Sequence, residues 1–456
     1  MVLRIFINLL LSVLLSAFLT IRRYFWSMTL NNILSFFLYT NTIPEIPFSG
    51  FILKKFINCA AFIFILIHFV LPFLLKKIFH WNAKKSFRYV FLFTFSLFSF
   101  FTAQLLHNIM LYLEKTDLYD NMSLQITPPD SANKKNLVLI IAESLENTYT
   151  DEKLFGENLL AGISSETKFG QYYQIAGTDN TASATTGFLC GIPSTPKLSE
   201  FIRGSVSSSF SKSVCISDIL HQYGYDNYFY TSDALPFANK NSFLRRHHFD
   251  EIKGAEELFR TPQDAGHSQF NGVSDARLFE AAYEKLLSLK NDRPFFMIIL
   301  TLNMHDPDGF IEKGCKTEHT DKKDVFIDIV KCSADQIATF VDKARKLPLK
   351  DTVFIITGDH LARPNPVFST LKKSNDRTVF NALVNADPPP VGKRPFLAWD
   401  MGASILSLLG FGDDAKIGLG VSLYSSEPNL LEKSGAEQLN KEPMKNSEKY
   451  NELLRD

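Results

Sequence analysis

The 456-residue sequence lacks a net charge, because 48 lysines and arginines balance 48 aspartates and glutamates. This balance excludes the global basic surplus expected of a nucleic-acid-binding protein. The sequence also lacks internal repeats, long low-complexity segments and any cysteine pair with C-x-x-C spacing. The missing spacing argues against a cysteine-ligated metal. The length allows two or three domains.

Phenylalanine, by contrast, is abundant, and 20 of the 42 phenylalanines lie in the first 110 of the 456 positions. Three apolar runs in this region approach or reach the length of about 20 residues that crosses a bilayer. These runs cover residues 5–20, 56–75 and 89–106. The first run could instead be a cleaved signal peptide, and Asn31 and Asn32 interrupt a possible fourth span near 25–39. We therefore expect a region of transmembrane helices over residues 1–113.

The loop between the second and third runs predicts the orientation in the membrane. Its basic residues are Lys76, Lys77, Lys84, Lys85 and Arg88. Because cytoplasmic loops carry an excess of lysine and arginine, we expect this loop in the cytoplasm. The third helix then emerges on the outer side, and the rest of the chain is extracytoplasmic.

The five cysteines agree with this orientation. Cys59 lies inside the second apolar run, where we interpret it as an apolar filler. The other four form two local pairs in the outer part of the chain. Disulfide bonds Cys190–Cys215 and Cys315–Cys332 are the economical interpretation in an oxidising compartment.

Beyond the membrane region, short apolar runs alternate with amphipathic segments. The candidate strands are 136–142, 225–231, 294–302 and 351–357. The candidate helices are 213–223, 275–290 and 333–347. This alternation predicts an α/β domain over residues 136–425 with a mostly parallel central sheet flanked by helices. We expect a polar linker over 114–135 before the domain and a polar tail over 426–456 after it.

Acidic or imidazole side chains follow three of the candidate strands. Glu143 follows the first, His305 follows the third, and Asp359 and His360 follow the fourth. Ligands of an open parallel sheet bind outside the carboxyl ends of its strands, so these residues should gather at one edge. Carboxylates with imidazole suit Zn²⁺ or Mn²⁺ rather than Ca²⁺ or a structural cysteine-type zinc. The alternative is that these residues only cap helices and form turns.

A hydroxyl nucleophile at such a metal would lose its proton more readily, because the cation stabilises the alkoxide. The hydroxyl-rich stretch 177–190 has the expected character, with small flanking residues. Its candidates are Thr178, Thr181, Ser183, Thr185 and Thr186. A helix that starts here would also favour a bound phosphate through its N-terminal amides.

Together, the motifs NLVLIIAESLENTY, GTDNTASATTGFLCGIP, MHDPDGF and TGDHLA, with the Cys315…Cys332 pair, resemble the phosphoglycerol transferase I family. This family lies in the lipoteichoic acid synthase branch of the sulfatase/alkaline-phosphatase superfamily. The resemblance covers roughly residues 136–425, with a looser match before them. It implies a membrane-bound enzyme that moves phosphoglycerol from phosphatidylglycerol to an osmoregulated periplasmic glucan or similar glycan. It also implies a phosphoglyceryl-threonine intermediate and the release of diacylglycerol.

The resemblance also implies roles for individual residues. The metal ligands would be Glu143, Thr181, Asp359 and His360, around one divalent ion, Mn²⁺ with Zn²⁺ as the alternative. Thr181 would be the nucleophile. His305 would contact the substrate phosphate, and Lys240 would contact the phosphoglycerol head where lipoteichoic acid synthases carry arginine. Such an enzyme would be a multi-pass protein of the bacterial inner membrane with its catalytic domain in the periplasm.

Two departures from the family are expected. The family has a long region after the catalytic domain, whereas the given sequence runs only to residue 456, and its membrane part has three expected spans, fewer than in the family. The first departure leaves the acceptor open. Two other hypotheses are a phosphoethanolamine transferase acting on lipid A or another glycan, and a non-catalytic membrane scaffold.

Overall fold

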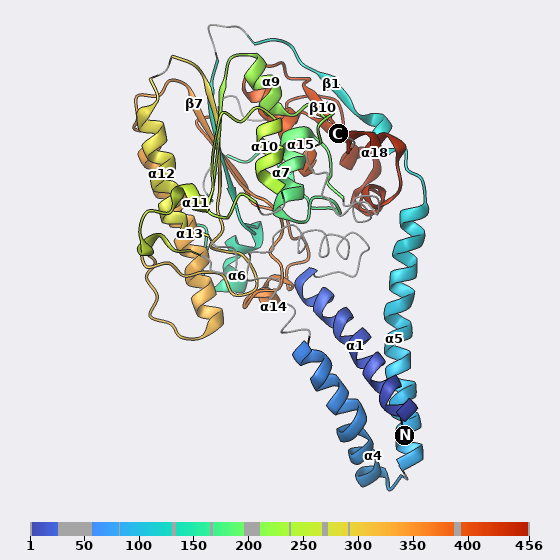
Figure 1. Cartoon of the computed structure of the whole chain (residues 1–456). Helices are drawn as coiled ribbons and strands as arrows, with labels where there is room; N and C mark the ends of the chain where they lie inside the picture. The colour runs from blue at the N-terminus through green and yellow to red at the C-terminus, as the bar shows by residue number, and fades with distance from the viewer. Residues whose placement is uncertain are drawn as a thin grey trace. The chain divides into compact units, whose positions relative to one another are not determined.

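The structure is a computed structural model (Figure 1). The chain forms two compact units, of which the first contains Met1–Glu114 and the second begins at Lys115. It describes residues 2–25, 57–81, 83–129, 134–164, 167–195, 210–236, 239–266, 272–290, 292–386 and 394–454. The possible fourth span near 25–39 lies almost entirely outside these residues.

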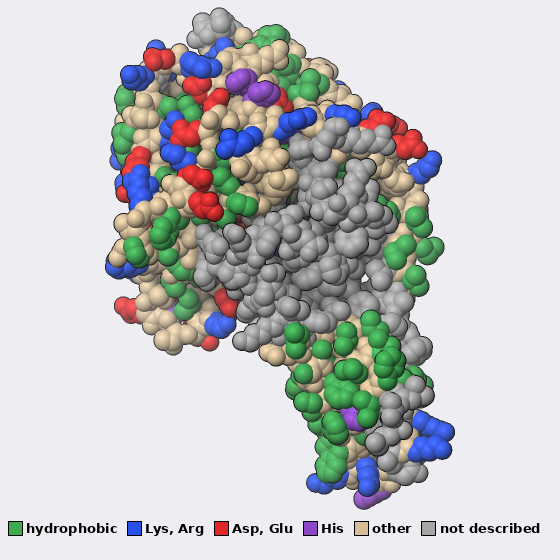
Figure 2. Space-filling model, in the orientation of Figure 1, with side chains coloured by type: hydrophobic (Ala, Val, Ile, Leu, Met, Phe, Trp, Pro, Cys, Tyr) green, Lys and Arg blue, Asp and Glu red, His purple; other side chains and the backbone are tan. Residues whose placement is uncertain are grey.

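The N-terminal unit consists of apolar helices. They are α1 (Val2–Phe25), a helix over Ile57–Phe79 that contains a π-helical turn (Leu66–Val70) and ends in α4 (Leu71–Phe79), and α5 (Ala83–Leu113). Among the described residues, Ile57–Phe79 is the one helix long and apolar enough to cross a membrane, and a shorter apolar helix covers Ile5–Ser16. Figure 2 shows hydrophobic side chains over the visible face of these helices. The second expected span thus has a helix of spanning length, whereas a multi-pass arrangement is not established.

The C-terminal unit is built on a six-stranded sheet with the order β5-β4-β6-β2-β7-β8. The strands are β2 (Asn136–Ala142), β4 (Asp226–Thr231), β5 (Glu251–Lys253), β6 (Phe295–Leu300), β7 (Thr352–Gly358) and β8 (Asn381–Val384). All neighbours are parallel except β7 and β8, which are antiparallel. Every residue of β2 is buried, as a continuous apolar strand between two parallel neighbours should be. The mostly parallel sheet is confirmed.

Helices cover both faces of this sheet. Leu137 and Leu139 of β2 pack in the core shared with α7 (Thr181–Cys190), α9 (Ile216–Gln222) and α15 (Ala398–Leu408). Val138 and Ile140 pack in the opposite core, with α12 (Asp275–Ser288) and α13 (Lys322–Ala344). The shorter helices are α6 (Glu152–Phe155), α10 (Lys240–Arg246), α11 (Ala255–Leu258) and α14 (Phe368–Leu371). Alternate side chains of the central strand therefore support two separate helical layers.

Helix boundaries shift from those expected, most of all for α13. This helix begins at Lys322 rather than near residue 333, because Asp321 caps it and accepts a hydrogen bond from the Lys323 amide at 2.9 Å. Its first turns carry Phe326 and Ile329, which are buried against the sheet. Their charged neighbours hid the apolar stripe in the sequence.

The expected linker and tail contain more structure than their polar composition indicated. Inside the linker, β1 (Ser123–Gln125) pairs with β10 (Lys416–Gly418), which pairs in turn with β11 (Gly420–Val421). The expected polar tail folds into α16 (Leu430–Ser434), α17 (Ala436–Leu439) and α18 (Glu448–Leu453). Leu439 and Tyr450 from these helices are buried in the main core. Each helix is too short to show a periodic pattern. A last pair of strands, β3 (Gln171–Tyr172) and β9 (Pro395–Phe396), completes the unit.

Candidate metal centre and active site

Two neighbouring strands bring together three side chains of the kinds that can bind a metal ion. Glu143 follows β2, and Asp359 and His360 follow β7, whose Gly358 pairs with Ala142. One potential ligand atom from each of the three lies within 4.8 Å of the others. All three residues are buried, with exposures of 1%, 0% and 1%. The expected gathering of strand-end residues at one edge of the sheet is therefore seen.

Hydrogen bonds orient these side chains but leave two of their atoms without a partner. Asp359 Oδ1 accepts the amides of Ser144 and His360, both at 2.8 Å. Nδ1 of His360 lies 3.0 Å from the Leu361 carbonyl oxygen, which makes this nitrogen the donor. Within the described chain, Asp359 Oδ2 and His360 Nε2 have no hydrogen-bond partner.

Unpaired buried polar atoms are costly, and they call for a missing ligand. Burial, followed by the charge of Asp359, also raises the pKa of Glu143, while His305 and His360 act in the opposite direction. A bound divalent cation would coordinate the two unpaired atoms and offset the repulsion between the carboxylates. The residues present thus fit a metal ion, and the mixed oxygen and nitrogen donors suit Zn²⁺ or Mn²⁺.

The hydroxyl of Thr181 lies against this cluster, with Oγ1 3.2 Å from Glu143 Oε2. Thr181 is the first residue of α7, and the preceding Asn180 caps the helix by accepting the Ser183 amide at 3.0 Å. The strand β2 and the helix α7 therefore deliver one carboxylate and one hydroxyl to the same place.

The other hydroxyl candidates in this stretch are occupied elsewhere. Each one donates its proton to a backbone carbonyl: Thr178 to Ile175, Ser183 to Ser194, Thr185 to Thr181 and Thr186 to Ala182. The distances are 2.9, 3.0, 2.7 and 2.9 Å. Geometry thus favours Thr181 over the four alternatives that the sequence left open.

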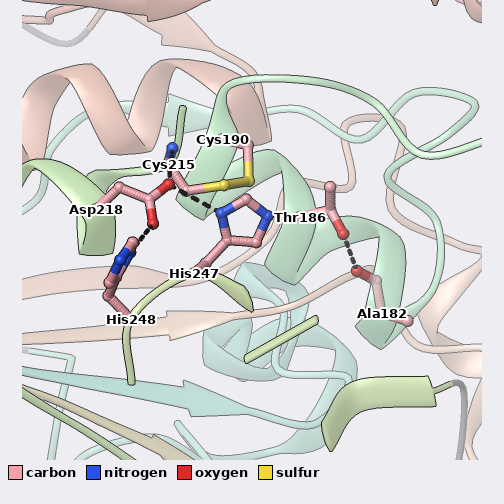
Figure 3. The surroundings of a disulfide bond; sticks show 7 residues. All are labelled: Ala182, Thr186, Cys190, Cys215, Asp218, His247 and His248. Atoms are coloured by element: carbon pink, nitrogen blue, oxygen red, sulfur yellow. Dashed lines mark hydrogen bonds and ion pairs between the residues drawn. A yellow bond between two sulfur atoms is a disulfide. The ribbon is translucent and has the colours of Figure 1, made fainter. Parts of the chain in front are cut away.

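Both expected disulfide bonds are present, Cys190–Cys215 and Cys315–Cys332. The first joins the last residue of α7 to the residue that precedes α9. Figure 3 shows His247 beside this bond. Asp218 Oδ2 lies 2.8 Å from His247 Nδ1, and Asp218 Oδ1 lies 2.8 Å from His248 Nδ1. The bond fixes the far end of the helix that carries Thr181.

The two expected substrate contacts are placed differently. His305 follows β6, which is the neighbour of β2 in the sheet. Lys240 starts α10 and forms an ion pair with Asp233, which lies beyond the end of β4. His305 therefore follows a strand next to the one that Glu143 follows, and the roles of His305 and Lys240 in substrate binding stay predictions.

A buried ion pair between Glu146 and Arg377 was missed in the sequence. Glu146 is fully buried and accepts the amide of Ala362 at 2.9 Å and Nε of Arg377 at 2.9 Å. Arg377 Nη2 also donates to the Ala362 carbonyl at 2.8 Å. The pair holds the loop that follows Asp359 and His360. Glu146 stands near Glu143 in the sequence, but no local pattern identifies Arg377 as its partner.

Arg363, which lies in the loop after Asp359 and His360, was also missed in the sequence. Its Nη2 donates to the carbonyl of Asp179 at 2.9 Å, and its Nη1 lies 3.9 Å from Asp306 Oδ1. Arg363 therefore links the metal loop to the segments that precede Thr181 and follow His305.

Curated proteins similar to this chain include two phosphoglycerol transferases I. The protein from Escherichia fergusonii is 36% identical over 305 residues, which cover 64% of this chain and 39% of that protein. The protein from Escherichia coli O6:K15:H31 is 35% identical over 313 residues, covering 66% and 40%. The chain thus spans about two fifths of the length of these relatives.

Comparison with solved structures and with family models agrees on the fold. The crystal structure of the lipoteichoic acid synthase LtaP from Listeria monocytogenes gives a TM-score of 0.53 at 18% identity, covering 69% of this chain and 82% of that one. The sulfatase family model matches residues 135–404, more than half of the sequence. The chain therefore belongs to the sulfatase family, as the resemblance of its motifs predicted.

Proposed function

We propose that this chain is a membrane-anchored, metal-dependent phosphoglycerol transferase. Its donor is phosphatidylglycerol, and its acceptor is a periplasmic glycan of the osmoregulated-glucan type. One observation carries the proposal: Thr181 Oγ1 lies 3.2 Å from Glu143, in a buried cluster where Asp359 Oδ2 and His360 Nε2 lie 3.4 Å apart and have no hydrogen-bond partner among the described residues. The similarity to phosphoglycerol transferase I supports the substrate class.

The proposed reaction has two displacement steps at phosphorus. In the first, Thr181 Oγ bonds to phosphorus, the bond to the diacylglycerol oxygen breaks, and diacylglycerol leaves with the proton. In the second, a hydroxyl of the acceptor attacks phosphorus and loses its proton, which frees Thr181. The amides at the start of α7 favour the phosphoryl anion, and His305 would hold its oxygens.

Glu143, Asp359 and His360, with the hydroxyl of Thr181, would hold one divalent ion, for which we propose Mn²⁺ and take Zn²⁺ as the alternative. When bound, this ion supplies positive charge that stabilises the threonine alkoxide and the phosphoryl oxygens. The protein contributes the rest through placement, because the buried carboxylates and the capped helix fix the nucleophile beside the ligands.

Location follows from the same proposal. We assign residues 1–113 to a multi-pass anchor in a bacterial inner membrane, 114–135 to the connection, and 136–425 to the catalytic domain in the periplasm, followed by 426–456. The spanning-length helix Ile57–Phe79 supports the anchor. Two disulfide bonds support an oxidising compartment for the domain.

The test is the mass of the covalent intermediate. Full-length protein is incubated with vesicles that contain phosphatidylglycerol or phosphatidylethanolamine, and its peptides are then analysed by mass spectrometry. We expect a phosphoglyceryl group on Thr181, and none in Thr181→Ala. A phosphoethanolamine adduct would favour the alternative transferase, and wild-type protein without an adduct from either lipid would refute the proposal.

A further inference from the structure

We propose that Asp306 and Arg363 select the headgroup of the donor lipid. The pair binds a hydroxyl of the glycerol headgroup and disfavours the ammonium of ethanolamine. This inference rests on the proposed function and deepens it, since it assigns the choice of substrate to two residues outside the metal cluster.

The position of the pair places it beside the reacting group. Asp306 directly follows His305 in the segment after β6, and β6 is the neighbour of β2, the strand that Glu143 follows. Arg363 lies three residues after His360 and donates to the carbonyl of Asp179, 2.9 Å away and two residues before Thr181. The pair therefore lies where the loops of the nucleophile, the metal ligands and the phosphate contact meet. In a phosphoglycerol group, the glycerol hydroxyls are only a few bonds from phosphorus. A headgroup whose phosphate reacts with Thr181 can therefore place a hydroxyl near these loops.

The two side chains face each other with unused hydrogen-bonding capacity. Arg363 Nη1 lies 3.9 Å from Asp306 Oδ1, which exceeds the range of about 2.7–3.2 Å for a direct hydrogen bond. In the part of the chain that the structure describes, Oδ1 of Asp306 is buried and has no hydrogen-bond partner. The side chains of Arg363 and Asp306 nevertheless stay 23% and 14% exposed. A small polar group of a ligand can therefore reach the exposed part of the two side chains, although Oδ1 of Asp306 is itself closed to solvent.

The chemistry of such a ligand follows from the two charges. A hydroxyl is both a donor and an acceptor, so it can donate to the carboxylate and accept from the guanidinium together. An ammonium group can only donate. An ammonium group bound to the carboxylate of Asp306 would lie close to the guanidinium of Arg363. The repulsion between these two cations would weaken the binding of ethanolamine.

A nearby surface ion pair provides the contrast and the control. Lys322 Nζ lies 2.9 Å from Asp308 Oδ1, in direct contact, with side-chain exposures of 76% and 57%. Both side chains are largely in solvent and already satisfy each other. Lys322→Gln removes one positive charge from the same region of the chain without touching the Asp306–Arg363 pair.

The experiment measures release of diacylglycerol by full-length protein from vesicles of phosphatidylglycerol or phosphatidylethanolamine. In Arg363→Gln, Asp306 no longer faces a cation. The ratio of kcat/KM for phosphatidylethanolamine to that for phosphatidylglycerol should then rise about tenfold or more. Asp306→Asn should slow the reaction with phosphatidylglycerol without raising this ratio, because Arg363 still repels the ammonium. Lys322→Gln should leave both rates as in the wild type.

If Arg363→Gln does not fold, binding to the wild-type protein decides, by calorimetry with sn-glycerol 1-phosphate and O-phosphoethanolamine. Tighter binding of glycerol phosphate that is lost in Asp306→Asn supports the inference, and equal binding of the two overturns it. If the wild type forms an adduct on Thr181 but Arg363→Gln leaves the ratio of the two kcat/KM values unchanged, the headgroup inference alone is overturned. Wild-type protein that releases diacylglycerol from neither lipid overturns both this inference and the proposed function.

Discussion

Two groups of buried acidic side chains lie beyond the carboxyl ends of the same sheet, and they differ in how their polar atoms are satisfied. In the first, made of Glu143, Asp359 and His360, two buried polar atoms have no hydrogen-bond partner among the residues that the structure describes. In the second, both oxygens of Asp275 accept backbone amides, from Leu302 at 2.9 Å and Asn303 at 3.0 Å.

Glu312 completes the second group in the same way. It accepts the Asn303 side-chain amide at 3.0 Å and the Ala276 amide at 3.3 Å, and its other oxygen accepts from Gln336. Burial alone therefore does not identify a ligand site. A buried carboxylate with all its hydrogen bonds made joins elements of the fold, whereas one with a free lone pair is available for a cation.

The difference between the two groups is tested by replacing one aspartate in each group with asparagine. In Asp359→Asn the amide oxygen can still accept the two backbone amides that Oδ1 accepts now. The fold should therefore survive, while Mn²⁺ affinity and adduct formation fall more than about a hundredfold. Calorimetric titration with Mn²⁺ and mass spectrometry of the adduct measure the two losses. Unchanged metal binding in this variant would show that Asp359 is no ligand.

Loosening the support of the metal loop should have a smaller effect. Glu146→Gln removes the charge that pairs with Arg377 and weakens the hold on the Ala362 amide. We expect a loss of about ten- to a hundredfold in metal affinity or activity, because a second layer of contacts orients the ligands. The same titration measures this loss. If the affinity of Glu146→Gln equals that of the wild type, the ion pair is not needed to position the loop.

The matching change in the satisfied group should act on stability instead. Both oxygens of Asp275 accept a backbone amide, so in Asp275→Asn the new NH₂ group must face a donor. The free energy of unfolding should fall by about 1–3 kcal/mol. Urea denaturation measures it, and titration with Mn²⁺ should give the wild-type affinity. A weaker metal affinity in this variant would blur the distinction between the two groups.

The pH dependence of stability should also report the burial of Asp275. Burial, followed by the charge of Glu312, raises the pKa of Asp275 to about 7. An aspartate in the unfolded chain titrates near pH ~3.9, so the native state binds the proton more tightly. Its stabilising contribution is present below about pH 4 and is lost as the pH rises through about 7. Urea unfolding should therefore give a lower free energy near pH ~8 than near pH ~5, and Asp275→Asn should reduce this difference. An equal difference in the variant would exclude Asp275 as the source.

The first group could be predicted from the sequence, and the second could not. Glu143 and Asp359 each follow a continuous apolar run, and the rules of parallel sheets place such residues at one edge. Asp275 stands at the start of a helix, and its partners come from the ends of β4 and β6. The contacts of Glu312 and Arg377 depend on how distant loops close over the sheet. No local periodicity encodes such contacts.

The same limit applies to the fold. Long apolar strands such as β2 and β7 were predicted because burial on both faces leaves a continuous pattern. The antiparallel edge strand β8 and the short helices α16 to α18 were not predicted. Their few buried residues, such as Tyr450, become apolar contacts only after the rest of the domain has folded around them.

The most direct test of the comparison is to locate a bound ion by anomalous X-ray diffraction from crystals of the wild-type protein soaked in Mn²⁺. We predict one anomalous peak, surrounded by Glu143, Thr181, Asp359 and His360, and none beside Asp275 and Glu312. A peak at the second group, or no peak at the first at saturating Mn²⁺, would contradict the claim that unsatisfied buried atoms mark the metal centre.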